Sequence, residues 1–297
     1  MKAAFLRQAG ALALMVMAGA GAYAEDIDIY QGSTPNSEAN LLIILDNAAA
    51  ASANSSFTCS TITVNDPGKN LGFEQCGLYG AVKSLAEDPA WSGDLNLGLM
   101  YFPPSGSSKT EFSDGGAFVL PASSRNSPAA ALQRMDSDGL ALMLARIKDL
   151  SLAKDKSDNN QIAQAMQEAW AFYQGKTGLS GTTYPGVANR LGCTKNFVLY
   201  ITLATNNQKP QDTGNLGGIK LQEAQAATSL PSQLVLPSWK SPISGKLPSK
   251  VNNYRSDYSD EWAKFMYTGS SPNLPTAYPG ITTYTIILGD GSNPDYE

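Results

Sequence analysis

The sequence predicts an α/β fold with a doubly wound, mostly parallel sheet. Short apolar runs bounded by polar residues recur along the chain, and segments with helical spacing of apolar residues separate them. The clearest run is Leu41–Leu45, and Asn196–Leu203 and Thr282–Leu288 have the same character. Such runs are typical of strands buried on both faces, as in parallel sheets. Strands that alternate with helices favour a sheet covered by helices on both sides.

Two further segments are expected to be strands. Leu95–Phe102 alternates less cleanly but is rich in residues that suit a sheet. Phe112–Pro121 is expected to be a weaker and more exposed strand, because Gly115 and Gly116 interrupt it.

Helices are expected between these strands, over Phe73–Ala86, Ser137–Leu152, Ile162–Tyr173 and Asp260–Tyr267. In the first, Cys76, Ala81 and Leu85 lie near one face. The spaced positions of the next two are Leu140, Leu144, Ile147 and Leu150, and then Ile162, Met166, Ala169 and Tyr173. We interpret these stripes as core-facing, since an amphipathic helix buries its apolar stripe.

A long loop-rich insertion is expected at about residues 208–253. Pro, Ser, Gly and Gln are frequent there, and the segment can hold a helix over Leu221–Ala227. A connection of this length is usually a functional or a mobile loop.

The N-terminus has the pattern of a signal peptide. Lys2 and Arg7 supply the positive charge, Ala9–Ala20 is apolar or small, and Ala22-Tyr23-Ala24 fits the cleavage rule. We therefore predict a signal peptide over residues 1–24, cleavage after Ala24, and a mature domain over residues 25–297. No later stretch approaches about 20 apolar residues, so no membrane span is expected after cleavage.

Composition excludes several classes of function. The chain has 42% hydrophobic and 16% charged residues and a net charge of −5, which argues against a nucleic-acid partner. It has no histidine, the usual general base and the commonest metal ligand. The Ser-His-Asp triad, the Cys-His dyad and histidine-containing zinc sites are thereby excluded. We expect no enzyme and assign no catalytic residue.

The chain has three cysteines, Cys59, Cys76 and Cys193. An exported protein usually pairs its cysteines, and because three is an odd number at least one is left over. Cys59 with Cys76 is the expected disulfide, because it closes a short loop. The alternative is that both are small buried apolar residues.

The end of the first strand is the candidate binding site. Ligands of open α/β sheets bind beyond the carboxyl ends of the strands, where Asp46 lies, followed by Asn47–Ser52. Here the sequence resembles the von Willebrand factor A (VWA) family, which has a D-x-S-x-S motif at this point. The resemblance implies a magnesium site completed by a later Thr and a later Asp.

Several positions depart from that pattern. Ala48 and Ala50 replace the two serines, and no Asp follows the strand that ends near Thr202–Thr205. Ser157, Asn159 and Asn160 occupy the region where the Thr would lie. Asp46 is thus the one candidate metal ligand, in a degenerate site, and Mg²⁺ or Ca²⁺ is the one cofactor left open. The alternative is that the Asp46 carboxylate caps the following turn.

A wider set of segments resembles the PilC/PilY family of type IV pilus tip adhesins and biogenesis proteins, in the family's order. The segments are Glu25–Tyr30, Asn40–Ala48, Glu74–Tyr79, Leu97–Met100, Cys193–Ile201, Asp260–Met266 and Thr282–Ile286. They span most of the predicted mature chain.

That resemblance implies an N-terminal VWA-like domain with a role in adhesion or pilus assembly. The implied partners are minor pilins or other pilus machinery, and a host or surface ligand. The implied location is the periplasm, outer-membrane surface or pilus tip of a Gram-negative bacterium. Two alternatives stay open: a periplasmic scaffold or assembly factor with no adhesive role, and a cation-dependent ligand-binding VWA protein. For both the pilus adhesion or assembly role and the periplasmic scaffold, we expect Asn47–Ser52 to form the contact surface.

Overall fold

The structure is a computed structural model of the chain. It describes residues 39–48, 71–90, 93–104, 114–118, 132–186, 195–203, 216–226, 258–268 and 280–288. The chain divides into two compact units, Met1–Ser37 and Glu38–Glu297, and every described residue belongs to the second.

The second unit has an α/β fold around a mostly parallel sheet. The strands are β1 (Ala39–Leu45), β2 (Leu95–Tyr101), β3 (Ala117–Phe118), β4 (Gln133–Arg134), β5 (Asn196–Leu203) and β6 (Thr282–Leu288). Their order is β3-β2-β1-β5-β6, and β4 pairs with β2 beside β3. The long strands pair in parallel, whereas β3 and β4 are antiparallel to β2. The chain thus winds outward from β1 in both directions, and the switch lies between β1 and β5.

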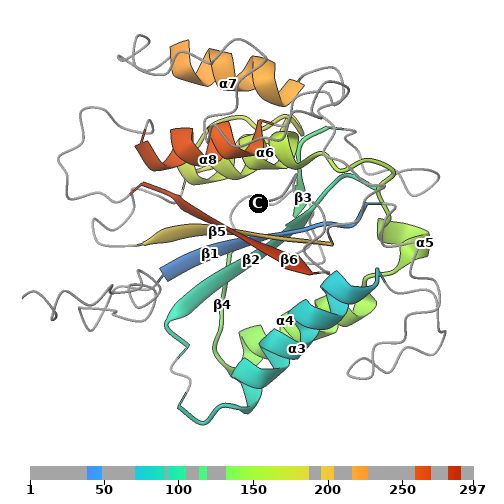
Figure 1. Cartoon of the computed structure of the whole chain (residues 1–297). Helices are drawn as coiled ribbons and strands as arrows, with labels where there is room; N and C mark the ends of the chain where they lie inside the picture. Colours follow the sequence, from blue (N-terminus) through green and yellow to red (C-terminus); the bar gives the residue numbers. More distant parts are fainter. Residues whose placement is uncertain are drawn as a thin grey trace, which may run out of the picture. The chain divides into compact units, whose positions relative to one another are not determined.

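Helices cover both faces of this sheet (Figure 1). They are α3 (Phe73–Glu87), α4 (Ser137–Asp149), α5 (Leu152–Asp155), α6 (Ile162–Gln174), α7 (Leu216–Ala226) and α8 (Ser259–Thr268). α3 and α4 lie against one face; α6 and α8 lie against the other, with α7 outside them (Figure 1). The helices lie on opposite faces because strands are added first on one side of β1 and then on the other. Right-handed crossovers that run in opposite directions along a sheet place their helices on opposite faces.

β1 is buried on both faces, as its apolar run predicts. Leu42 and Ile44 point into the cluster under α6 and α8, whereas Ile43 and Leu45 point into the cluster over α3 and α4. All four are at most 2% exposed. A strand in this position has no polar face, which explains its unbroken run of apolar residues.

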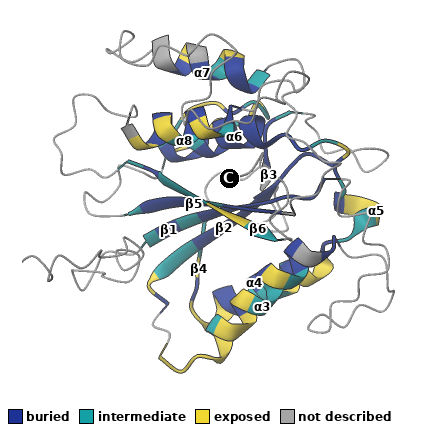
Figure 2. Cartoon of the chain, viewed as in Figure 1, coloured by how far each residue is buried: buried dark blue, intermediate teal, exposed yellow. Residues whose placement is uncertain are grey.

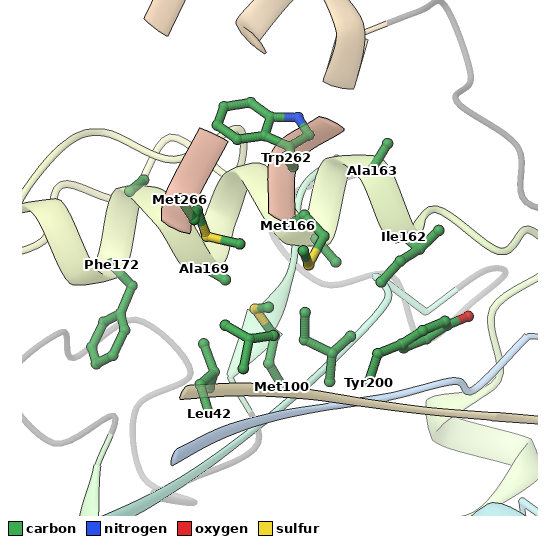
Figure 3. Packing of buried hydrophobic residues seen from close by; sticks show 14 of the residues in the cluster. Leu42, Met100, Ile162, Ala163, Met166, Ala169, Phe172, Tyr200, Trp262 and Met266 are labelled. Carbon is green, nitrogen blue, oxygen red and sulfur yellow. The ribbon is translucent and has the colours of Figure 1, made fainter. Parts of the chain in front are cut away.

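α6 is the most enclosed helix of the described chain (Figure 2). The expected stripe of Ile162, Met166, Ala169 and Tyr173 is buried, which confirms that prediction. Figure 3 shows Met166 above the sheet residues Leu42 and Met100. The opposite side of α6 is covered as well, so Gln164, Gln167 and Glu168 are also buried.

Three asparagines join the N-terminal ends of the central strands. Asn40 is aligned with Asn96 on β2 and with Asn196 on β5. The Asn40 amide donates to Asn196 Oδ1 at 2.9 Å, and Asn96 Nδ2 donates to Asn40 Oδ1 at 3.1 Å. Because these bonds form only when the three residues are side by side, the ladder fixes the register of the three strands.

Two helices differ from the sequence prediction. The predicted helix Ser137–Leu152 ends at Asp149, and a separate turn, α5, follows. The break occurs because the Asp155 carboxylate accepts from Ser151 N at 2.9 Å and starts a new helix there.

The buried face of α3 also differs from the expected one. Ala81 is exposed and Leu85 is half-buried, while Leu78 and Val82 are buried. The helix is rotated so that Gln75 faces the end of α4, where its side-chain amide donates to Ile147 O at 2.6 Å and to Leu150 O at 2.9 Å. A buried polar residue that satisfies the end of α4 thus sets which face of α3 is inside.

The strand predicted over Phe112–Pro121 is described only as the short β3, and β4 has no sequence prediction. Gly115 and Gly116 precede β3 and are buried. A Cβ on Gly116 would lie 2.2 Å from Met100 Sδ, so a side chain there would have to displace the Met100 side chain. The two glycines therefore serve close packing before β3, whereas we expected them to interrupt a weak strand.

Several predictions fall outside the described residues: the signal peptide over residues 1–24, its cleavage after Ala24, and most of the insertion at 208–253. The helix expected within that insertion is α7, which begins at Leu216. Among the described residues, no helix has the length and apolar content needed to cross a membrane.

We predict that Asn40→Ala lowers the free energy of unfolding by about 1–3 kcal/mol, because it removes the hydrogen bonds of a buried amide to the buried Asn196 and to the partly buried Asn96. Urea unfolding measures this change. The matched control is Asn159→Ala, which removes a half-buried amide for which the structure gives no hydrogen bond. An Asn40→Ala variant as stable as the control would contradict the role of the ladder.

Candidate functional site

The candidate site lies at the switch point of the sheet. Asp46 directly follows β1, and its backbone N–H donates to Ile201 O on β5 at 2.9 Å. Its side chain lies on the same face as Leu42 and Ile44, because side chains alternate along a strand. Tyr200 and Thr202 have the matching position at the end of β5. The N-terminal end of α6 faces the same point through Asn160.

Four donors from the chain surround the Asp46 carboxylate. Oδ1 accepts from Ala48 N at 2.9 Å. Oδ2 accepts from Thr202 Oγ1 at 2.6 Å, from Asn160 Nδ2 at 3.0 Å and from Tyr200 OH at 3.3 Å. The first bond is the one that the turn-capping alternative predicts. The other three tie the end of β1 to β5 and to the turn before α6.

This carboxylate is removed from water. Asp46 is 2% exposed, and burial raises the pKa of its carboxyl. The hydrogen bonds from Thr202, the Ala48 N–H and Tyr200 act in the opposite direction and lower that pKa. An enclosed carboxyl of this kind is stable only because its oxygens have donors.

Asn47 and Ala48 are also inside the protein. Asn47 Nδ2 donates to Phe102 O at 2.8 Å and to Asp155 O at 2.5 Å, and its Oδ1 accepts from Phe102 N at 2.8 Å. Both residues are at most 1% exposed. Our expectation that Asn47–Ser52 forms the contact surface is therefore wrong for Asn47 and Ala48, and the rest of that range lies outside the described residues.

The described residues around Asp46 do not fit a divalent cation. A cation needs converging acceptor oxygens. Asn160 turns its amide nitrogen toward Asp46, while its Oδ1 accepts from Ile162 N at 3.3 Å. The Thr202 hydroxyl already donates to the carboxylate. Within the described ranges no group of three or more His, Cys, Asp or Glu side chains could hold a metal ion.

Among the described residues, the exposed part of this edge is formed by α5 and the turn after it. Asp155 is buried and accepts from Tyr101 OH at 3.0 Å, which anchors the segment to β2. Ser157 N then donates to Asn47 O at 2.7 Å. In this turn the Lys156 ammonium lies 3.3 Å from the Asp158 carboxylate, and the Asp158 side chain is 62% exposed. This anchored turn displays opposite charges beside the end of β1.

A second buried carboxylate, Glu168, holds the loop after α6. It accepts from Ser180 Oγ at 2.6 Å, from Ser180 N at 2.9 Å and from Tyr184 OH at 2.5 Å. Burial raises the pKa of its carboxyl, and these donors act against that rise. A Cβ on Gly178 would lie 2.0 Å from Glu168 Oε1, so the loop passes directly over the carboxylate.

Cys76 is disulfide-bonded. The other two cysteines, Cys59 and Cys193, lie outside the described residues, so the pairing of Cys59 with Cys76 stays a prediction. The alternative in which Cys76 is a free apolar residue is wrong.

Sequence reasoning singled out Asp46 and the region of Asn160 but did not assign roles to Tyr200, Thr202 or Glu168. Period-two alternation in β5 could have found the first two, because it places their hydroxyls on the face of Asp46. Glu168 lies on the side of α6 opposite the apolar stripe, and its burial depends on the loop after α6 and on the turn at Gly115. No local pattern signals that covering.

No protein-family model matches this chain, and no curated protein sequence matches it.

We predict that equilibrium dialysis of the purified chain against Mg²⁺ or Ca²⁺ finds no stoichiometric binding, because donors fill the Asp46 site. Asp46→Ala serves as the control. Stoichiometric binding by the wild-type chain that disappears in Asp46→Ala would contradict this reading of the site.

We predict that Glu168→Gln weakens the pH dependence of stability. The raised pKa means that the folded chain holds the Glu168 proton more tightly than the unfolded chain does. In the unfolded chain this carboxyl has its ordinary pKa of 4.5. The resulting stabilisation is full below about 4.5 and is lost as the pH rises through the raised folded value.

Urea unfolding at a series of pH values from 4.5 toward neutrality measures this slope. The control is Glu87→Gln, which changes a carboxylate that is 68% exposed. An unchanged slope in Glu168→Gln would contradict the prediction.

Proposed function

We propose that this chain is an exported, non-enzymatic binding domain of the VWA type that works at the type IV pilus, in adhesion or in pilus assembly. The observation that carries the proposal is that the Asp46 carboxylate is buried and accepts hydrogen bonds from its own chain. At the point where the VWA resemblance places a metal ion, Thr202, Asn160 and Tyr200 donate to the carboxylate. A domain with this edge filled by its own side chains acts through its surface.

The topology supports the VWA assignment. β1 is central, the chain winds outward from it in both directions, and Asp46 lies at the carboxyl end of β1 beside β5. Ligands of doubly wound sheets bind at this switch point. The PilC/PilY resemblance includes residues of β1, α3, β2, β5, α8 and β6, so it reaches the sheet and a helix on each of its faces.

The absence of an enzymatic role is supported by the chemistry of the chain. The sequence has no histidine. The two carboxyls with raised pKa, Asp46 and Glu168, are at most 2% exposed and accept hydrogen bonds from their own chain. A general acid or base must reach the proton of a substrate, and these enclosed groups do not.

Export is supported by the N-terminal pattern and by Cys76. Disulfides persist in oxidising compartments such as the periplasm, and Cys76 is disulfide-bonded. We place the protein in the periplasm, on the outer-membrane surface or at the pilus tip of a Gram-negative bacterium.

The proposed contact surface is α5 with the turn Lys156–Asn159. It lies at the Asp46 edge, is held by Asp155 and Ser157, and presents the side chains of Lys154, Lys156 and Asp158. Partners that fit are minor pilins or other pilus machinery, and a host or surface ligand. The same surface would serve a periplasmic assembly factor without an adhesive role.

We predict that deleting the gene abolishes either surface pili or adherence. Loss of surface pili identifies the assembly role, and normal pili with lost adherence identify the adhesive role. Complementation with the double variant Lys156→Glu/Asp158→Lys should restore the missing property poorly, because it reverses both charges of the turn. The control is Lys148→Ala on the exposed side of α4. Normal pili together with normal adherence in the deletion strain would overturn the proposed function.

A further inference from the structure

The outer edge of β6 has the features of a strand-pairing surface. β6 pairs with β5 over all seven residues, and among the described strands it ends the sheet order. The structure gives no hydrogen bond to the outward-facing backbone groups of Thr282–Leu288. Unpaired N–H and C=O groups along an edge are a template for another strand.

The usual protection against such pairing is missing from this strand. Its sequence, TTYTIIL, has no charged residue, no proline and no glycine. Natural sheets block open edges with lysine, proline or a bulge, or cover them. Thr285 and Ile286 are exposed, and Ile286 is 44% exposed despite its apolar side chain. Figure 2 shows an exposed stretch on β6. An open edge of this composition favours coverage by another strand.

The strand is complementary to itself. An antiparallel alignment of two copies over all seven residues is centred on Thr285 and places Tyr284 of each copy opposite Ile286 of the other. Thr283 is then opposite Ile287. Aromatic and β-branched residues opposite one another are favourable cross-strand pairs, and no like charges meet. Tyr284 is already positioned by Phe197, whose ring centroid lies 6.2 Å away.

We propose that the chain forms a two-fold dimer in which the β6 strands of two copies pair antiparallel about Thr285 and continue the sheet. The two-fold symmetry satisfies both edges at once, since each strand is donor and acceptor for the other. A seam of one strand per copy is smaller than the roughly 1,600 Å² of a standard interface, so the dimer is weak and depends on concentration. This inference does not depend on the pilus proposal.

Sedimentation equilibrium of the purified chain over a wide concentration range tests the dimer. The wild-type chain should dimerise. Thr285→Lys and Thr285→Glu should each weaken dimerisation by about fivefold, because like charges directly opposite in a ladder repel. An equimolar mixture of these two variants should restore dimers, since the two residues at position 285 then carry opposite charges.

The matched control is Ala145→Lys, which adds the same charge at an exposed position of α4 and should leave dimerisation unchanged. Since Thr285 is exposed, both charge variants should keep the wild-type free energy of unfolding. A wild-type chain that stays monomeric would overturn the proposal. Undiminished dimers in Thr285→Lys and Thr285→Glu, or a mixture that fails to dimerise, would overturn it as well.

Discussion

The Asp46 carboxylate is the group on which the C-terminal edge of the sheet depends. It is 2% exposed, so an ionised or even a neutral carboxyl is stable there only with hydrogen-bond partners. Those partners come from three places: the end of β5, the turn before α6 and the backbone after β1. The same interaction that satisfies a buried polar group therefore fixes how the first strand, the last central strand and the most buried helix meet.

Polar residues have a similar role elsewhere in the core. The asparagine ladder aligns β1, β2 and β5 at their N-terminal ends, and Gln75 joins α3 to the end of α4. Glu168 holds the loop after α6. Apolar burial drives these elements together without specifying their alignment, because the hydrophobic effect is non-directional. Hydrogen bonds that form at one register only supply the alignment, so these buried polar side chains define the arrangement that the apolar clusters stabilise.

The two ends of the sheet are treated differently. Beside β2, the short β3 pairs antiparallel with Met100 and Tyr101, and β4 pairs antiparallel with Asn96 and Leu97. Gly116 lies against the Met100 side chain. β6 has no comparable partner among the described strands. Among the described strands, the sheet thus has one end partly covered by short strands and one end suited to pairing, and the exposed turn beside Asp46 is a separate surface at the carboxyl ends of the strands. A protein with both surfaces can bind a partner and a second copy without competition between them.

The sequence alone predicted the α/β class, since an apolar run such as Leu42–Leu45 suits a strand buried on both faces, and a parallel sheet covered by helices buries its strands in this way. The absence of histidine, which excludes whole classes of chemistry, is also a property of the sequence. The tertiary structure decided the state of the site, because Asn160, Tyr200 and Thr202 are 114, 154 and 156 residues from Asp46 along the chain. It also decided which face of α3 is buried, because the Gln75 side chain of that helix donates to carbonyls at the distant end of α4. Local patterns encode which residues avoid water; they do not encode which distant donor meets a buried acceptor, because that depends on strand register and on the packing of helices.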